Sequence, residues 1–469
     1  MRTIFFELNE VPWKIIHWFI ERHPQSAFAT LSKSGSNYET HAADSGELHP
    51  WITWPTLHRG VSNDVHGISH LGQDLRESNR DFPALWDMLA REGRTVGVMG
   101  AMQSYPLPSL TSQFSFYVPD TYAPTPDTIP ASLSLFQDVN LKLTQQNSRN
   151  VDRSISKKHA LTFMATLPRI GVVPATVKMI GSQLLREVTD KTKLNRRRAV
   201  QSALYFDAFM HNLKRSNPEF SSFFSNHVAA TMHRFWAASF QEDFDQFDLP
   251  DEWVESYRTE IEWAMLIADE FLQRMMNYAR SKGDCRIIVL SSMGQAATTA
   301  QIRDGYYSIG DIPKFLSGIG IDPEEARPAQ AMAPDISLHL SARAAERFRA
   351  IQRELEDALG NLQIDIDQRN MLHMRALVEI DIEQGMPTVP IGNRVFTLDD
   401  LGFVYVPDQD KVATTAYHIP NGILMAWQPG SQGRGPAPQP VSVLEVAPAL
   451  LAAHDIRAPD YMTKPSFSF

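Results

Sequence analysis

Short apolar runs alternate with segments of helical periodicity at the start of the chain. The run Thr3 to Leu8 is apolar and rich in β-forming residues, so it predicts a buried strand, and Val11 to Glu21 carries apolar residues at helical spacing. Pro83 to Glu92 again predicts a helix, and Thr95 to Met99 predicts the next strand. Because parallel strands are buried on both faces and are joined by helices, this alternation favours an α/β protein with a mostly parallel sheet.

The same two patterns recur at wider intervals in the rest of the chain. Ser221 to Ser225 and Arg286 to Leu290 predict two further strands, and Val443 to Ala453 predicts a helix that ends before Pro459. Ala342 to Leu359 carries Arg and Glu three and four residues apart, which predicts an exposed helix. No repeat at a solenoid period is visible, so we expect one α/β core interrupted by insertions.

The amino-acid composition excludes several classes of protein. The chain has 469 residues, of which 43% are hydrophobic and 21% charged, a mixture that excludes a disordered or low-complexity protein. The net charge of −10 argues against a general nucleic-acid binder. The single cysteine, Cys285, excludes an internal disulfide and fits a reducing compartment. The apolar start of the chain does not have the pattern of a signal peptide, and we therefore expect a cytoplasmic protein.

Charge is distributed unevenly along the chain. Arg149 to Arg198 contains twelve Lys and Arg against three Asp and Glu, a local balance of +9 that leaves −19 for the remainder. Within the window Ala160 to Leu185, charged residues and prolines interrupt the apolar run, so we expect no membrane-spanning helix. A basic, partly amphipathic segment in an acidic protein favours peripheral contact with a membrane surface or a lipid-linked phosphate. The alternative is a solvated helical face.

Polar residues directly follow the first predicted strand, in the order Glu7, Leu8, Asn9 and Glu10. Side chains at this position lie at the carboxyl edge of an open α/β sheet, where ligands bind. Alternation along a strand places Glu7 and Asn9 on the same side. The alternative for Asn9 is a cap on the following helix.

Two further motifs carry candidate chemistry. In the stretch from Trp51 to Gly60, Pro55 favours a helix start, which would place the Thr56 hydroxyl beside backbone N–H groups that attract an anion. A threonine that acts as a nucleophile beside a phosphate and a threonine that caps a helix have the same local sequence. The spacing therefore does not distinguish the two roles. In the second motif, His227 and His233 stand close to Asn226 and Arg234, a combination suited to a metal or an oxyanion.

In their order along the chain, these motifs resemble the alkaline phosphatase superfamily, specifically its type I phosphodiesterase and nucleotide pyrophosphatase branch. The matching stretches are ELNEVPWKII, WPTLHRGVSNDVHGI, FPALWDMLAREGRTVGVMG, NHVAATMHRFW, VLSSMGQ, HIPNGI and VAPALLAAHDIRAPDYM. The resemblance implies an alkaline-phosphatase-like, mostly parallel sheet sandwiched by helices. Residues 1–120, 215–300 and 400–469 would form this core, 121–214 a basic helical insertion and 301–399 a second cap insertion.

The resemblance also assigns roles to single residues. It places Thr56 on the nucleophile and His233 and His418 on two histidine ligands of one zinc ion, so we expect these three side chains to converge on one pocket. Asn9 and Ala229, however, stand where that branch has aspartates. Ser292 and Met293 replace its Asp-His pair after a later strand. Amide, hydroxyl and thioether groups are poor zinc ligands, and we therefore do not expect a two-zinc site.

The remaining candidate ligands would hold at most one divalent ion, zinc or manganese. The alternative is a pocket that works without metal. His233 and His418 would hold the ion with help from Asn226, Glu7 or Glu10, and either glutamate could instead act as the general base. An anionic substrate would be gripped by Arg234 and by donors near Thr56, with tryptophans packed on a sugar or a base. The residues expected to contact this substrate are Asn9, Trp54, Asn226, His227, Arg234, Trp236 and Gln295.

Three functions agree with this reading. The first is a hydrolase or transferase acting on phosphate or sulfate esters, with Thr56 as nucleophile and an anionic small molecule or lipid-linked phosphate as substrate. The second is a metal-independent glycosyl or phosphoglycosyl transferase in cell-envelope polysaccharide assembly, with Glu7 or Glu10 as base. The third is a non-catalytic binding protein.

Overall fold

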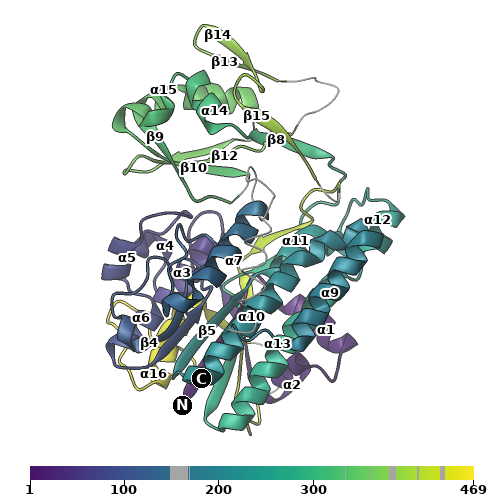
Figure 1. The fold of residues 1–469 in the computed structure, drawn as a ribbon, viewed down its shortest axis with the longest axis vertical. Helices are drawn as coiled ribbons and strands as arrows, with labels where there is room; N and C mark the ends of the chain where they lie inside the picture. Colours follow the sequence, from purple (N-terminus) through teal and green to yellow (C-terminus); the bar gives the residue numbers. More distant parts are fainter. Residues whose placement is uncertain are drawn as a thin grey trace.

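The computed structural model describes residues 1–147, 167, 170–332, 334–360, 362–379, 387–408, 411–433 and 439–469. At its centre lies an eight-stranded sheet of order β18-β2-β17-β6-β1-β5-β3-β4 (Figure 1). Its strands are β1 (Arg2–Leu8), β2 (Ser36–His41), β3 (Val96–Met99), β4 (Phe114–Val118), β5 (Phe220–Ser225), β6 (Cys285–Leu290), β17 (Asn421–Trp427) and β18 (Gln439–Ser442). Only β17 pairs antiparallel with its neighbours in this sheet, which confirms the mostly parallel α/β prediction.

Helices cover both faces of the sheet (Figure 1). Alternate residues of β1 enter the two apolar layers, with Ile4 and Phe6 on one face and Phe5 on the other, as the period-2 pattern of a strand requires. The first face packs against α1 (Trp13–Arg22), α2 (Ala27–Ser34), α10 (Arg197–Ser216), α11 (His227–Ser239) and α13 (Glu260–Lys282). The second packs against α3 (Pro50–Arg59), α6 (Leu85–Arg91) and α16 (Val446–Ala453).

A second apolar core forms within residues 309–403, at the top of Figure 1. It is built from α14 (Ile312–Gly318), α15 (Ala342–Leu359), β8 (Gly305–Ile309), β9 (Ala326–Ala329), β10 (Asp335–Leu340), β11 (Gln363–Ile366), β12 (Met371–Arg375), β13 (Thr388–Ile391), β14 (Arg394–Thr397) and β15 (Phe403–Pro407). We call this unit the cap. It meets the main core through polar contacts, among them the stacked rings of His70 and His373, whose centroids lie 3.4 Å apart.

The remaining helices are α4 (Asn63–His66), α5 (Arg76–Asp81), α7 (Ser134–Asn147), α9 (Pro174–Thr189) and α12 (Asp251–Tyr257), and the short strands β7 (Gly294–Ala297) and β16 (Ala416–Ile419) pair with each other. Part of the expected basic segment 149–198, namely 149–166 and 168–169, lies outside the described residues. Its later part forms α9 and the start of α10, and α10 packs into the main core. Among the residues that the structure describes, no helix is long and apolar enough to cross a membrane.

Candidate metal centre

The ends of three adjacent strands place polar side chains at one edge of the sheet. The strand β1 lies between β5 and β6 and runs parallel to both, so the residues after all three meet at the carboxyl edge. Asn9 and Glu10 follow β1, Asn226 follows β5, and Ser292 follows β6. The structure therefore places these polar residues together at one edge of the sheet.

Glu10 is the centre of the cluster. Its Oε2 atom lies 2.9 Å from His233 Nε2 and 3.5 Å from His418 Nε2, and its side chain is 3% exposed. The backbone at Glu10 is left-handed, with φ of 58°, a conformation that a non-glycine residue adopts at a cost and that concentrates at functional sites. One carboxylate oxygen and two ring nitrogens thus lie within 4.8 Å of one another, contributed by the end of β1, by α11 and by β16.

Backbone carbonyls fix the orientation of both imidazole rings. His233 Nδ1 lies 2.7 Å from Ala416 O, and His418 Nδ1 lies 2.6 Å from Leu48 O. A carbonyl oxygen only accepts hydrogen bonds, so each Nδ1 carries the proton, and in the neutral ring each Nε2 presents a lone pair toward Glu10. Histidines that bind metals are oriented in this way.

Lone pairs that face a carboxylate oxygen repel it unless positive charge lies between them. Either protons on Nε2 or one divalent cation can supply that charge. Around a tetrahedral ion with bonds of about 2.0–2.1 Å, ligand atoms lie roughly 3.3 Å apart, a separation that the observed 2.9 and 3.5 Å bracket. Imidazole and carboxylate are ordinary ligands of zinc and are also compatible with manganese. The three residues therefore fit a single divalent ion.

The pKa values of Glu10 and His233 show the same coupling. Burial acts to raise the pKa of Glu10, but the neighbouring charges of His233 and His418 and their hydrogen bonds outweigh it and hold the pKa well below its usual range. Burial acts to lower the pKa of His233, and the Glu10 carboxylate together with the bond to Ala416 raises it above the ordinary value. Glu10 is thus an anion that needs a cation beside it.

Amide side chains hold Glu10 in place. Gln295 Nε2 donates to Glu10 Oε2 at 2.5 Å and to Ala229 O at 3.2 Å, and β7 pairs Gln295 directly with His418 of β16. Asn9 Nδ2 lies 2.7 Å from both Glu10 Oε1 and Asn226 Oδ1. Asn9, Asn226 and Gln295, which we expected to contact substrate, therefore surround the carboxylate.

Comparison with known proteins finds similarity in structure alone. No protein-family model matches the chain, and no curated protein matches its sequence. Solved structures match over nearly its whole length. Murine ectonucleotide pyrophosphatase/phosphodiesterase 5 has a TM-score of 0.41 and 11% identity, with 99% of this chain and 98% of that chain covered.

Two further matches carry related names. A mutant of alkaline phosphatase PafA has a TM-score of 0.47 and 12% identity, with 99% and 98% of the two chains covered. Phosphonoacetate hydrolase from Sinorhizobium meliloti, in complex with phosphonoacetate, has a TM-score of 0.39 and 12% identity, with 95% and 94% covered. The likeness is one of fold. What the metal centre does has to follow from its own residues.

The helix α3 differs from the sequence prediction. It begins at Pro50, with His49 as the N-cap residue, and Pro55 lies inside it. Proline favours the first position of a helix, so both prolines predict a helix start. The helix begins at the earlier one. Thr56 therefore lies in the second turn, and the expectation that it stands beside the N-terminal N–H groups was wrong.

The Thr56 side chain is fully buried and belongs to a separate polar network. Its Oγ1 donates to Asp44 Oδ1 and lies 2.9 Å from His66 Nε2. His66 Nδ1 accepts from the Ile68 N–H, so Nε2 carries the ring proton and donates to Thr56. Among the described contacts, none joins Thr56 to Glu10, His233 or His418. Of the three groups expected to converge, the structure brings together the two imidazoles.

Glu7 and Trp54 lie beneath the centre, between β1 and α3. Glu7 Oε1 accepts from Ser222 Oγ at 2.5 Å and lies 3.0 Å from His58 Nε2, and all three side chains are buried. Trp54 Nε1 donates to Asn9 Oδ1 at 2.7 Å. Glu7 and Asn9 thus face the same helix, as strand alternation predicts. Glu7 is engaged by Ser222 and His58, so of the two glutamates Glu10 is the one that lies beside His233 and His418.

Three other expected substrate contacts lie elsewhere on α11. His227 uses both ring nitrogens inside the core, with Ser225 Oγ at 2.8 Å and Ala264 O at 3.0 Å. Trp236 is buried and donates to Asp243 Oδ2. The Arg234 guanidinium lies over the Phe235 ring. These contacts give His227 and Trp236 structural roles, and they place the Arg234 guanidinium beside a neighbouring ring.

The structure adds three residues that sequence reasoning missed. The His49 ring lies 5.7 Å from that of His418, and Arg375 of the cap hydrogen-bonds Tyr417, the residue before His418. Arg198 at the start of α10 lies within electrostatic range of His233. His49 directly precedes Pro50, where α3 begins. A sequence search for polar residues next to a predicted helix start could have found it. Nothing in the local sequence of the cap marks Arg375.

Proposed function

We propose that the protein is a hydrolase or transferase of phosphate or sulfate esters that works with one zinc or manganese ion held by Glu10, His233 and His418. The observation that carries this proposal is the convergence of two oriented Nε2 atoms and one carboxylate at the ligand-binding edge of the sheet. When bound there, a divalent ion would polarise an ester oxygen and make a nearby water more acidic.

Cationic side chains around the centre support an anionic substrate. Arg375 approaches from the cap and Arg198 from α10, and neither belongs to the ligand set. Together they would attract and orient a phosphate or sulfate group next to the metal. His49 stacks on Trp51 and borders His418, which gives the same pocket an aromatic wall for the organic part of the ester.

We leave Thr56 outside the reacting groups of this proposal. Its side chain is buried, and its hydroxyl is already engaged by Asp44 and His66. For hydrolysis the attacking oxygen would come from water.

A kinetic panel tests the proposal. Purified protein would be assayed on bis(p-nitrophenyl) phosphate, p-nitrophenyl phosphate and p-nitrophenyl sulfate, before and after treatment with a chelator and after zinc or manganese is restored. We expect turnover of at least one ester, loss of that turnover on chelation and recovery with metal. His233→Gln should abolish the activity while the protein stays folded.

The exposed residue His339 of β10 supplies the matched control, because His339→Gln removes an imidazole that is not in the ligand set and should keep full activity. Turnover that persists after chelation and in His233→Gln would support metal-independent transfer instead. A complete lack of turnover in metal-loaded protein would favour a binding role without catalysis.

A further inference from the structure

The helix α9 (Pro174–Thr189) exposes most of its aliphatic side chains, although Met179 packs against the main core. Its buried residues are Thr176, Gln183 and Glu187. Its exposed residues include four aliphatic side chains, Val177, Leu184, Leu185 and Val188, which are 52%, 57%, 74% and 76% exposed. A surface helix normally packs its apolar stripe against the core and turns charged residues to water. This one turns its apolar stripe outward.

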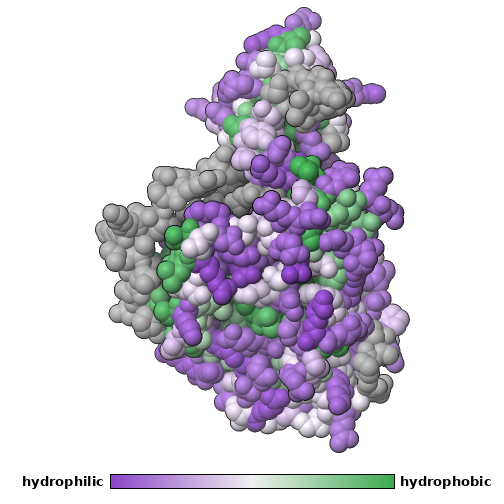
Figure 2. All heavy atoms as spheres, turned by 90° about the vertical axis from the view of Figure 1, so that its right-hand side faces the viewer, coloured by the Kyte–Doolittle hydropathy of each residue, from purple (hydrophilic) through white to green (hydrophobic). Residues whose placement is uncertain are grey.

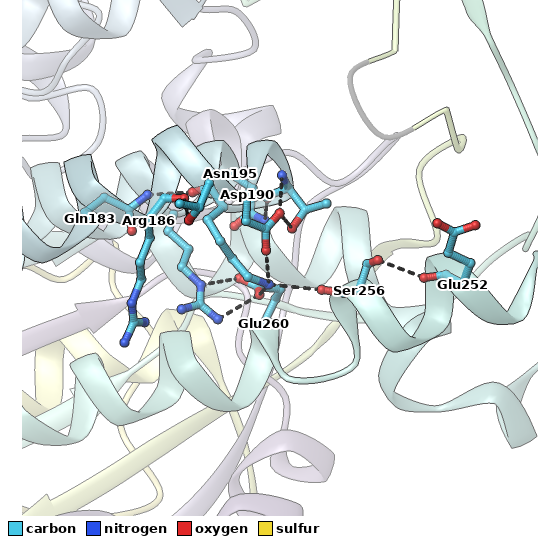
Figure 3. Close-up of polar contacts among 11 residues, drawn as sticks. Gln183, Arg186, Asp190, Asn195, Glu252, Ser256 and Glu260 are labelled. Carbon is cyan, nitrogen blue, oxygen red and sulfur yellow. Dashed lines mark hydrogen bonds and ion pairs between the residues drawn. The ribbon is translucent and has the colours of Figure 1, made fainter.

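Polar contacts attach the inner face of α9 to the rest of the protein (Figure 3). Gln183 Nε2 donates to Glu187 Oε1 at 2.9 Å and to Lys193 O at 2.6 Å. Arg197 forms two hydrogen bonds with Glu187, at 2.9 and 2.7 Å. In the turn that follows, Lys193 and Arg196 both bind the buried Glu260 of α13. The helix is therefore held firmly in an orientation that leaves its apolar side exposed.

Basic residues follow the apolar stripe around one side of the helix. Successive residues of a helix are rotated by about 100° around its axis. Lys178 therefore lies next to Leu185 at the edge of the stripe, and Arg186 lies farther from the stripe on the same side. Among the described residues, neither Lys178 nor Arg186 forms an ion pair, and the Arg186 side chain extends away from the cluster in Figure 3. Figure 2, which shows the right-hand side of Figure 1, has apolar patches between polar ones on this face of the molecule. An aliphatic stripe with a cationic border matches the boundary of an anionic bilayer.

We propose that α9 is an interfacial helix that docks the protein on a lipid membrane with anionic headgroups. Val177, Leu184, Leu185 and Val188 would enter the acyl boundary, while Lys178 and Arg186 contact headgroup phosphates. Charge favours this docking side, since residues 170–198 contain seven Lys and Arg against two acids, a balance of +5, whereas the whole chain carries −10. An anionic surface therefore attracts this segment of an otherwise acidic protein.

The size of the stripe favours a membrane over a protein partner. Its exposed aliphatic surface comes from four side chains on one helix, whereas each partner in a stable protein interface contributes about 20–30 residues and roughly 800 Å². A bilayer needs no matching surface, because each side chain that enters it gains hydrophobic transfer energy independently.

Vesicle co-sedimentation tests the docking proposal with the full chain. Binding to vesicles of phosphatidylcholine with about 30% phosphatidylglycerol would be compared with binding to vesicles of pure phosphatidylcholine. The first composition has about one anionic lipid in three. We expect binding to the anionic vesicles that weakens as salt is raised. The double variant Leu184→Ser/Leu185→Ser should bind at least about tenfold more weakly, and Lys178→Glu/Arg186→Glu should also lose binding.

Matched controls lie on the cap, where Val395→Ser removes a 70% exposed valine and Arg343→Glu reverses an exposed charge. Both should bind vesicles as the wild type does. Equal binding of wild type and the α9 variants, or no binding to anionic vesicles at low salt, would overturn the proposal. Sedimentation velocity supplies a second readout. A wild-type dimer that becomes monomeric in Leu184→Ser/Leu185→Ser would also overturn it, because the stripe would then join two copies of the chain.

Discussion

At the scale of single residues, the centre depends on groups that position Glu10 as much as on the ligands. Gln295 is 1% exposed, and its amide joins Glu10 to the backbone of α11. Its place opposite His418 in the β7–β16 ladder fixes the carboxylate relative to one of the rings. Such outer contacts tune metal affinity because they restrict the rotamers of the ligand.

We therefore expect Gln295→Met to weaken zinc binding about 10- to 100-fold while the ligands remain. Methionine fills a similar volume and removes the donated hydrogen bond. Isothermal titration of zinc into metal-free protein would measure the change, with Gln273→Met on the outer side of α13 as control. Unchanged affinity in Gln295→Met would show that Glu10 is positioned without this amide.

His227 has a separate role, which a pH series can isolate. Burial lowers its pKa to about 4, and the ordinary value in an unfolded chain is about 6.5. Between these two values the unfolded chain binds a proton that the folded protein does not. The free energy of unfolding therefore falls as pH falls from 6.5 to 4. At pH 5 this histidine accounts for a loss of about 2 kcal/mol relative to pH 7.

Urea unfolding at pH 7 and pH 5 would measure this loss in the wild type and in His227→Gln. We expect the difference between the two pH values to shrink by about 2 kcal/mol in the variant. The exposed His339→Gln should leave the difference unchanged. A wild-type pH dependence retained in His227→Gln would contradict the assignment of His227 as a buried neutral ring.

At the scale of elements, a buried ion cluster decides where α9 lies. Glu260 is fully buried at the start of α13 and binds both Lys193 and Arg196 (Figure 3). Removing one partner of a buried ion pair leaves uncompensated charge in the interior, which costs about 3–5 kcal/mol. Glu260→Gln should lower the free energy of unfolding by that order and expose α9 to proteolysis. The exposed Glu252→Gln on neighbouring α12 should change it by less than about 0.5 kcal/mol.

Elements with long, regular patterns were predictable from the sequence, and sites of special backbone geometry were not. The buried strands β1 and β6 and the helix α15 appear within two residues of their predicted bounds. The start of α3 was misplaced because two prolines five residues apart carry the same local signal, and only packing chooses between them. The left-handed turn that aims Glu10 at two histidines has no pattern in the sequence.

At the scale of the whole molecule, the main core and the cap have separate apolar interiors joined by polar contacts. Gln363 of the cap donates to Glu47, and Arg369 pairs with Glu77. Arg375 at the end of β12 reaches Tyr417 beside the metal ligands. The pairing of His233 with His418 followed from the family resemblance, whereas the contribution of the cap required the fold, since 42 residues of chain lie between Arg375 and His418.

We expect Arg375→Met to raise the KM of an anionic ester about 10- to 100-fold, because a charged hydrogen bond to the substrate is lost. Zinc affinity should stay the same, since Arg375 is not a ligand. Steady-state kinetics and zinc titration would measure the two effects, with Arg394→Met on β14 of the cap as control. Equal KM values for Arg375→Met and wild type would remove this residue from substrate binding.

The stoichiometry of metal binding tests the central claim most directly. Zinc would be titrated into metal-free wild type, Glu10→Gln, His418→Gln and the control His339→Gln, with circular dichroism to show that each is folded. The account predicts one zinc ion per chain in wild type and control, and at least about a hundredfold weaker binding in the two ligand variants. Wild type that binds no zinc or manganese, or ligand variants that bind as tightly as wild type, would contradict it.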